Sequence, residues 1–263
     1  MEIYSHFDFS YAIAGALVGL LVGLTGVGGG SLMTPLLTLL FGVAPSIAVG
    51  TDLAFAALTK GVGTLAHRLH GQIRWDIVKL LCLGSLPAAL LTILILKHLG
   101  TISDIWQQYI RFSIGLSVLL TALSLIFRSR MKSWLQLHPS YQLEGQSRKV
   151  VTVIAGIVIG TLVTISSIGA GAIGATFIVF LYPQIKPAQV AGTDIAYAVP
   201  LTAIAALGHL WLGTIHFGLL FALLIGSVPA IWIGANLART FPEKYMRGVL
   251  VGVLTLVGLK LVS

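Results

Sequence analysis

Long apolar runs occupy almost the whole chain and restrict the folds available to it. A helix that spans a bilayer needs about 20 consecutive, mostly apolar residues. Eight runs meet that length: 11–43, 45–66, 77–99, 106–127, 150–182, 187–208, 216–238 and 245–262. The sequence therefore predicts an all-α integral membrane protein of about eight hydrophobic segments, with no room for a soluble domain.

The composition agrees with a membrane protein and argues against a nucleic-acid partner. Only 9% of the residues are charged, against about a quarter in soluble domains. The formal net charge of +8 comes from basic residues at the ends of the apolar runs, where lipid headgroups and insertion bias explain them. We therefore expect the lipid bilayer as a partner, and no nucleic acid. The single cysteine, Cys82, is interpreted as a small packed side chain.

An offset of 142 residues aligns the first part of the chain with the second. Because rare polar residues and glycines match at this spacing over about sixty positions, we infer an internal duplication. The chain then divides into an N-terminal tail (1–10), a first transmembrane repeat (11–127), a cytoplasmic linker (128–149) and a second transmembrane repeat (150–263). The matched residues include Gly29 with Gly171, Pro45 with Pro187, Gly50-Thr51-Asp52 with Gly192-Thr193-Asp194, and His67 with His209.

The first run of each repeat is too long for one ordinary span and is interrupted by small residues. Four glycines lie within residues 26–30, and serines and glycines fill residues 166–171. Glycine lowers helix stability by about 1 kcal/mol per residue, so each run is predicted to be two half-helices, broken or re-entrant. The first run has no basic leader and no small-residue cleavage site, so it is interpreted as mature structure.

The distribution of lysine and arginine predicts how the repeats are oriented. If each broken run doubles back, the two repeats are inverted and twelve basic residues share one side against three (Lys97, Arg111 and Lys260), with Lys60 buried. If the broken runs cross, the best split is nine against six. The positive-inside rule favours two inverted repeats, with the N-terminus outside and the 128–149 linker in the cytoplasm.

Two acids, Asp52 and Asp194, lie inside apolar runs at equivalent places. An ionised carboxylate near the bilayer centre costs about 2.5–3.5 kcal/mol on insertion scales, so each acid must face protein or water. Two interpretations remain open. The Gly-Thr-Asp motif caps a following helix, or the acids handle protons or substrate.

Lys60 breaks the symmetry of the repeats because its counterpart is Thr202. A lysine inside the membrane needs an anion, either an aspartate or a bound ligand, which makes Lys60 a candidate substrate contact. The alternative is that the side chain extends to the membrane surface.

His67 and His209 follow the acids by fifteen residues. At 1.5 Å per residue this spacing is about 22 Å along one helix, so acid and histidine of one repeat cannot touch. Inversion brings the acid of one repeat to a depth near the histidine of the other, which makes all four candidates for proton coupling. The alternative is an interfacial histidine at a helix C-terminus. No further ligand has metal-site spacing, so no metal is predicted.

The glycine and serine breaks are the predicted cradle for an anion. A half-helix that starts at a break directs free N–H groups and a positive dipole end towards the cavity, and nearby hydroxyls add donors. Tight helix packing through small residues is the alternative. The predicted substrate-binding residues are Thr25, Gly28, Gly29, Gly30, Ser31, Thr51, Lys60, Ser166, Ser167, Gly169, Gly171 and Thr193.

Three stretches carry a resemblance to a known family. The segments GLTGVGGGSLMTPLL, AVGTDLAFAALTKGVGTLAHRLHGQIRW and VAGTDIAYAVPLTAIAALGHLWLGTIHF resemble the sulfite exporter TauE/SafE family of bacterial membrane transporters. The resemblance implies a secondary transporter of the bacterial plasma membrane that moves sulfite, sulfoacetate or related organosulfonates, coupled to protons or to the membrane potential. No cofactor is implied.

Two other functions are weighed against a transporter. An anion channel would share the fold without proton coupling. An intramembrane hydrolase could also use buried aspartate and histidine, but the chain has no G-x-S-x-G or H-E-x-x-H motif, so no enzyme is predicted. The expected partner besides lipid is a small anionic substrate, and homo-oligomerisation is left open.

Overall fold

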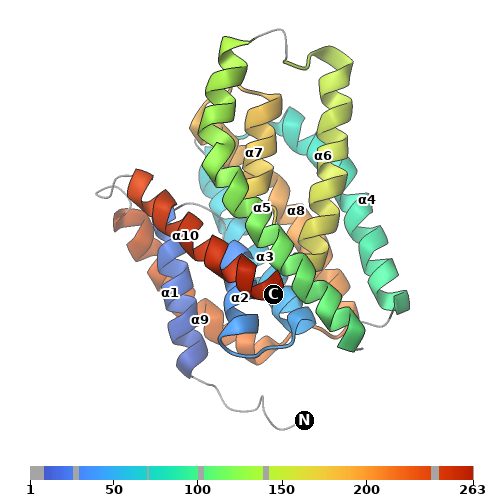
Figure 1. The fold of residues 1–263 in the computed structure, drawn as a ribbon, viewed down its shortest axis with the longest axis vertical. Helices are drawn as coiled ribbons and strands as arrows, with labels where there is room; N and C mark the ends of the chain where they lie inside the picture. The colour runs from blue at the N-terminus through green and yellow to red at the C-terminus, as the bar shows by residue number, and fades with distance from the viewer. Residues whose placement is uncertain are drawn as a thin grey trace.

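The protein is described from a computed structural model, which covers residues 9–25, 30–69, 71–99, 104–138, 142–237 and 243–262. Within these ranges, the side chains of residues 22–25, 30–31, 62–63, 65–67, 104, 235–236 and 243–247 are outside the described part. The described residues form ten helices and no strand, which confirms the all-α prediction (Figure 1). The helices are α1 (Phe9–Thr25), α2 (Gly30–Leu39), α3 (Pro45–Leu69), α4 (Trp75–Leu99), α5 (Asp104–Leu137), α6 (Gly145–Ser166), α7 (Ala172–Leu181), α8 (Pro187–Trp211), α9 (Phe217–Leu237) and α10 (Glu243–Val262).

Each of the two overlong apolar runs holds a pair of helices, α1 with α2 and α6 with α7. Five helices of the described part are long and apolar enough to cross a membrane: α4, α5, α6, α8 and α9. Shorter apolar helices lie at residues 9–21, 172–181 and 248–262. An integral membrane protein is therefore confirmed, whereas the count of eight segments stays a prediction.

The helix bounds recur at the spacing found in the sequence. Adding 142 to the bounds of α2 gives those of α7, adding it to α3 gives α8, and the first residue of α4 maps onto that of α9. The equivalent of each helix is therefore known from α2 onwards, and the contacts of one repeat can be compared with those of the other.

The two repeats interlock through their first helices. Helix α1 packs along α9, and its equivalent α6 packs along α4. A Cβ added at Gly15 would lie 2.5 Å from the carbonyl oxygen of Leu223, and one added at Gly156 would lie 2.4 Å from that of Leu81, so both interfaces need glycine for the helices to approach. Gly15 and Gly156 are 141 residues apart, whereas Leu81 and Leu223 are 142 apart. The second repeat therefore has one more residue between its first two helices.

Both broken runs double back on themselves. The rings of Tyr11, early in α1, and Phe41, just after α2, have centroids 5.0 Å apart. In the second repeat, the hydroxyls of Thr152, early in α6, and Tyr182, just after α7, are 2.9 Å apart. Each pair joins the two open ends of a helical hairpin, as the re-entrant alternative requires.

The hairpins open towards opposite ends of the molecule (Figure 1). The loop after α2 meets the start of α5, where the Gln107 amide donates to the Ser46 hydroxyl over 2.8 Å. The loop after α7 meets the far end of α5, where the Gln136 amide donates to the Pro183 carbonyl over 3.2 Å. This arrangement agrees with the predicted inversion, and the sidedness in a bilayer stays a prediction.

The predicted linker differs in the structure, because α5 continues to Leu137. Between Arg128 and Leu137 the sequence has neither glycine nor proline to end the helix. Leu135 is buried and Trp134 is exposed, so this stretch is a helix packed on one face, and residues 138–144 connect the repeats.

Candidate functional site

The threonine of each Gly-Thr-Asp motif binds the other repeat. The hydroxyl of Thr193 accepts a hydrogen bond from the backbone N–H of Arg74 over 3.0 Å. At the equivalent place, the hydroxyl of Thr51 accepts one from the N–H of His216 over 3.1 Å. Both threonines are fully buried. The two hydroxyls, which were predicted as substrate contacts, therefore form reciprocal hydrogen bonds that join the two repeats. We call this pair of hydrogen bonds the clasp.

The glycine of each motif allows the same clasp to close. A Cβ at Gly50 would lie 2.5 Å from the carbonyl oxygen of Thr214, and one at Gly192 would lie 2.6 Å from that of Gln72. The motifs lie inside α3 and α8, which begin at residues 45 and 187. The alternative in which the motif caps a following helix is therefore wrong, because the helix has already begun.

The acid of each motif lies against the short helix of its own hairpin. Asp52 is fully buried and accepts a hydrogen bond from the Thr34 hydroxyl on α2 over 2.6 Å. Asp194, 5% exposed, lies at the start of α7, where a Cβ added at Gly174 would be 2.4 Å from its Oδ1. A helix N-terminus carries a partial positive charge that favours a carboxylate. In this conformation the start of α7 therefore faces the protein's own acid.

Lys60 connects the two acids to the second break. Its ammonium group donates a hydrogen bond to the carbonyl oxygen of Ala170 over 2.7 Å. Both Asp194 and Asp52 act on it electrostatically, Asp194 more strongly. The side chain is thus turned inward, and the alternative in which it extends to the membrane surface is wrong. Its counterpart Thr202 donates instead to the Ala198 and Val199 carbonyls of its own helix.

Four polar atoms around Lys60 have no hydrogen-bond partner among the described residues. They are Oδ1 of Asp52, Oδ1 of Asp194, the Ser167 hydroxyl and the Tyr197 hydroxyl, and their residues are 0–5% exposed. The Ser167 hydroxyl faces the Asp52 carboxylate. An unpaired buried polar group costs about 1–3 kcal/mol, so such groups gathered in one place indicate a site for a guest. We call Asp52, Lys60, Ser167, Ala170, Asp194 and Tyr197 the central cluster.

The second break forms one wall of the central cluster. Ser167 ends α6 in the left-handed region with φ 60°, and Gly169 and Gly171 have φ of 133° and 146°, which side chains other than glycine rarely adopt. The Ser166 hydroxyl is held by the Leu162 carbonyl over 2.7 Å. Ser166, Ser167 and Ala170 are at most 8% exposed, so the structure is a conformation closed around this break.

Several predicted residues lie outside the described part. They are Gly28 and Gly29 of the first break and the side chains of Thr25, Ser31 and His67. Gly30 is the first residue of α2. The first cradle therefore stays a prediction.

His209 is an anchor and does not meet an acid. Its Nε2 donates to the Thr164 carbonyl over 2.9 Å, and its Nδ1 is 2.8 Å from the Thr214 hydroxyl. Both ring nitrogens are satisfied as a neutral imidazole, and the side chain is 1% exposed. His209 lies in the last turn of α8, as the alternative placed it, and is buried there, and its predicted proton coupling has no supporting contact.

Comparison with known proteins assigns the family. The family described as sulfite exporter TauE/SafE matches residues 11–261, which is nearly the whole chain. The chain belongs to the TauE/SafE family.

Curated relatives of this TauE/SafE protein carry transporter names. The chain is 35% identical over 253 residues to "Probable membrane transporter protein YjnA" of Bacillus subtilis, covering 96% of this chain and 99% of that protein. It is 27% identical over 242 residues to "Probable membrane transporter protein YdhB" of the same organism, covering 89% and 91%. No solved structure matches. The chain is therefore a multi-pass transporter of the bacterial cell membrane, and the expectation that it is not an enzyme is confirmed.

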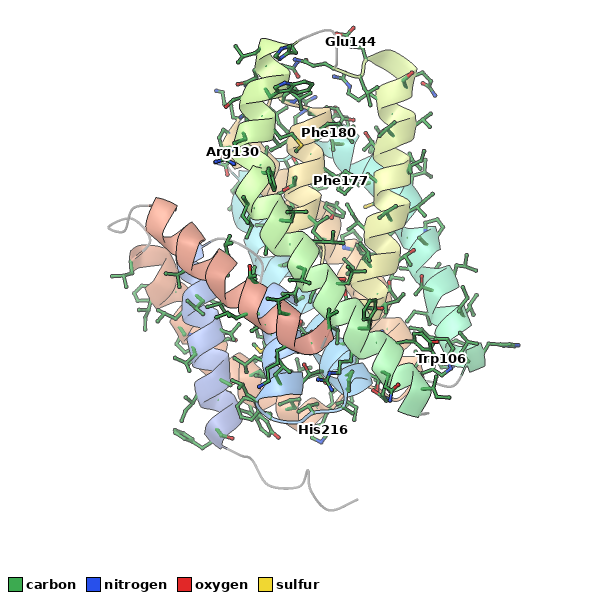
Figure 2. The ribbon with its side chains drawn as sticks, in the orientation of Figure 1. Trp106, Arg130, Glu144, Phe177, Phe180 and His216 are labelled. Atoms are coloured by element: carbon green, nitrogen blue, oxygen red, sulfur yellow. The ribbon has the colours of Figure 1, made fainter. Side chains whose placement is uncertain are left out.

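Two apolar cavities lie on the sides of this TauE/SafE protein, outside the central cluster. One of about 470 Å³ lies between α5, α6 and α7, where Figure 2 shows Phe177 and Phe180, and one of about 260 Å³ lies between α1, α2 and α10. Because their walls are almost wholly apolar, neither suits an anion. In the described part no group of three His, Cys, Asp or Glu could hold a metal.

Two groups of the central cluster, the Tyr197 hydroxyl and the Ala170 carbonyl, were not predicted from the sequence. Tyr197 is three residues after Asp194, so both lie on one face of α8, and this spacing could have identified it. The contact between Lys60 and Ala170 joins residues 110 apart in the chain, so no local pattern could have indicated it.

Proposed function

We propose that this TauE/SafE protein carries small sulfur-containing oxyanions, such as sulfite or sulfoacetate, through the central cluster by alternating access, with proton coupling. The observation that carries the proposal is the meeting of Lys60, two buried acids and the second break around unpartnered polar atoms. Sulfur oxyanions suit this set because helix amides, hydroxyls and an ammonium group all donate hydrogen bonds to oxygen. The family description, sulfite exporter, gives the substrate class.

The arrangement of charges supports coupling to a proton. Asp52 and Asp194 face one ammonium, that of Lys60, so the three side chains carry one net negative charge when all are ionised. Arg128 of α5 acts on Asp194 as a further, weaker cation. An incoming anion adds negative charge to a buried site, which is unfavourable unless a carboxylate takes up a proton.

The position of Asp194 also supports proton coupling, because its carboxylate and the anion would compete for the start of α7. Its carboxylate already occupies the start of α7, beside Gly174, where an oxyanion would also bind. Protonation weakens this contact, because a neutral carboxyl group gains less from the positive helix end. The start of α7 then becomes free for the substrate, so one proton accompanies each anion.

The proposal is tested with purified protein in liposomes that contain a trapped pH-sensitive dye. An inward gradient of sulfoacetate, which does not cross lipid unaided, is expected to acidify the lumen, and sulfite should do the same beyond the rate in protein-free liposomes. The double variant Asp52→Asn/Asp194→Asn should lose this acidification.

Two results would contradict the proposal. Anion flux without proton movement, or flux that persists in the double variant, would favour an anion channel. No flux of either anion would reject the substrate class. The buried second break of this conformation argues against a permanently open pathway.

A further inference from the structure

Tyr197 is a fully buried tyrosine whose hydroxyl has no hydrogen-bond partner among the residues that the structure describes. At the equivalent position of the first repeat, 142 residues earlier, the chain has Phe55, which is also buried. An aromatic ring alone therefore satisfies the packing at this position in one repeat. A buried hydroxyl without a partner destabilises a protein by about 1–3 kcal/mol, so a role only in packing gives no reason for tyrosine in place of phenylalanine.

The Tyr197 hydroxyl and the free oxygen of Asp194 converge on Gly174. A Cβ added at Gly174 would lie 2.3 Å from Oη of Tyr197 and 2.4 Å from Oδ1 of Asp194. Gly174 is the third residue of α7, so both oxygens lie at the positive end of that helix. A hydroxyl donor, a carboxylate and a helix start thus surround the same point.

The residues at this point make the central cluster asymmetric. Lys60 reaches the second break from the first repeat, and its counterpart is Thr202. Tyr197 comes from the second repeat, and its counterpart is Phe55. Two donors that have no equivalent by duplication therefore lie on the side of α7.

We propose that the Tyr197 hydroxyl donates a hydrogen bond to the transported anion when the anion binds at the start of α7. Tyr197 is then a substrate-contact residue, and the anion binds at one asymmetric position on the α7 side. This inference rests on the proposed function, because it assigns a residue to the same substrate.

The test compares Tyr197→Phe with Tyr182→Phe. The Tyr182 hydroxyl has a partner, Thr152, at 2.9 Å, and lies at the open end of the α6–α7 hairpin. Tyr197→Phe should raise the KM for sulfite about 10- to 100-fold, the effect of losing a hydrogen bond to a charged group, with a smaller change in maximal rate. Its melting temperature without sulfite should equal or exceed that of the wild type. Tyr182→Phe should lower the melting temperature and leave the KM unchanged.

The outcomes separate this inference from the proposed function. A wild-type protein that neither transports sulfite nor is stabilised by it would overturn the proposed function, and this inference with it. If the wild type transports sulfite and the Tyr197→Phe variant has an unchanged KM for sulfite, this inference alone is overturned. A Tyr197→Phe variant that is less stable than the wild type without sulfite would also overturn it, because the hydroxyl would then have a structural partner.

Discussion

Replacing Lys60 by methionine tests whether the buried ammonium holds the central cluster together. Methionine keeps an unbranched apolar stem and removes the charge. The variant loses the hydrogen bond to the Ala170 carbonyl and leaves Asp52 and Asp194 without their nearest cation. We expect anion transport to be abolished, since the substrate then meets two carboxylates and no ammonium.

The loss of stability follows from the same contacts. Removing one partner of a direct buried ion pair costs about 3–5 kcal/mol, whereas the Lys60 ammonium bonds the Ala170 carbonyl and acts on the two acids only electrostatically. Lys60 is only partly buried by its accessible surface, so solvent screening reduces this figure, and we expect about 2–3 kcal/mol. For a chain of this size, with about 2–4 °C per kcal/mol, the melting temperature should fall by roughly 4–12 °C.

A double-mutant cycle measures how strongly Lys60 and Asp194 interact. In Lys60→Met/Asp194→Asn one of the two carboxylates left without a cation is gone, so the double variant should be more stable than the sum of the single effects predicts, by about 1–3 kcal/mol. Lys79→Met on the exposed face of α4 is the control and should change neither stability nor transport. Additive single effects, or a Lys60→Met protein as stable as the wild type, would refute the electrostatic coupling between Lys60 and Asp194.

Two further predictions concern the joints between the repeats. Thr193→Val leaves the Arg74 N–H without its acceptor and should destabilise the protein by about 1–3 kcal/mol in thermal unfolding. Thr193→Ser keeps the acceptor and should leave the stability unchanged. Equal stability of the two variants would contradict the clasp. Gly156→Ala places a methyl group against the Leu81 carbonyl and should cost about 1–3 kcal/mol, while Gly252→Ala, which meets nothing within 4 Å, serves as its control. If both glycine variants unfold at the same temperature, α4 and α6 do not need this close approach.

The sequence predicted the helical architecture because its signals are local or repeated. The length of the apolar runs indicates spans, the glycines and serines at the breaks weaken the helix, and the constant spacing of polar residues identifies equivalent positions. The location of the acids inside the protein follows from the expense of a carboxylate in lipid. None of these features depends on how the repeats pack together.

The details of the central cluster depend on that packing and could not be predicted. The hydroxyl of Thr193 binds a backbone group 119 residues away, so the sequence pattern alone left substrate contact and structure equally open. The one-residue difference in spacing between Gly15 and Gly156 appears only when each is seen against its partner helix. The extension of α5 to Leu137 was missed because the polar composition of that stretch was taken to mean a linker.

The exchange of contacts between repeats has a consequence for synthesis in the cell. Helix α1 leaves the ribosome first, yet its partner α9 is made after eight-tenths of the chain. Lys60 must also wait in the bilayer, because its partner Ala170 is made 110 residues later. The predicted inverted duplication extends this dependence: a single ancestral copy would have needed a second molecule of itself, inserted the opposite way up, to supply the partner of its first helix.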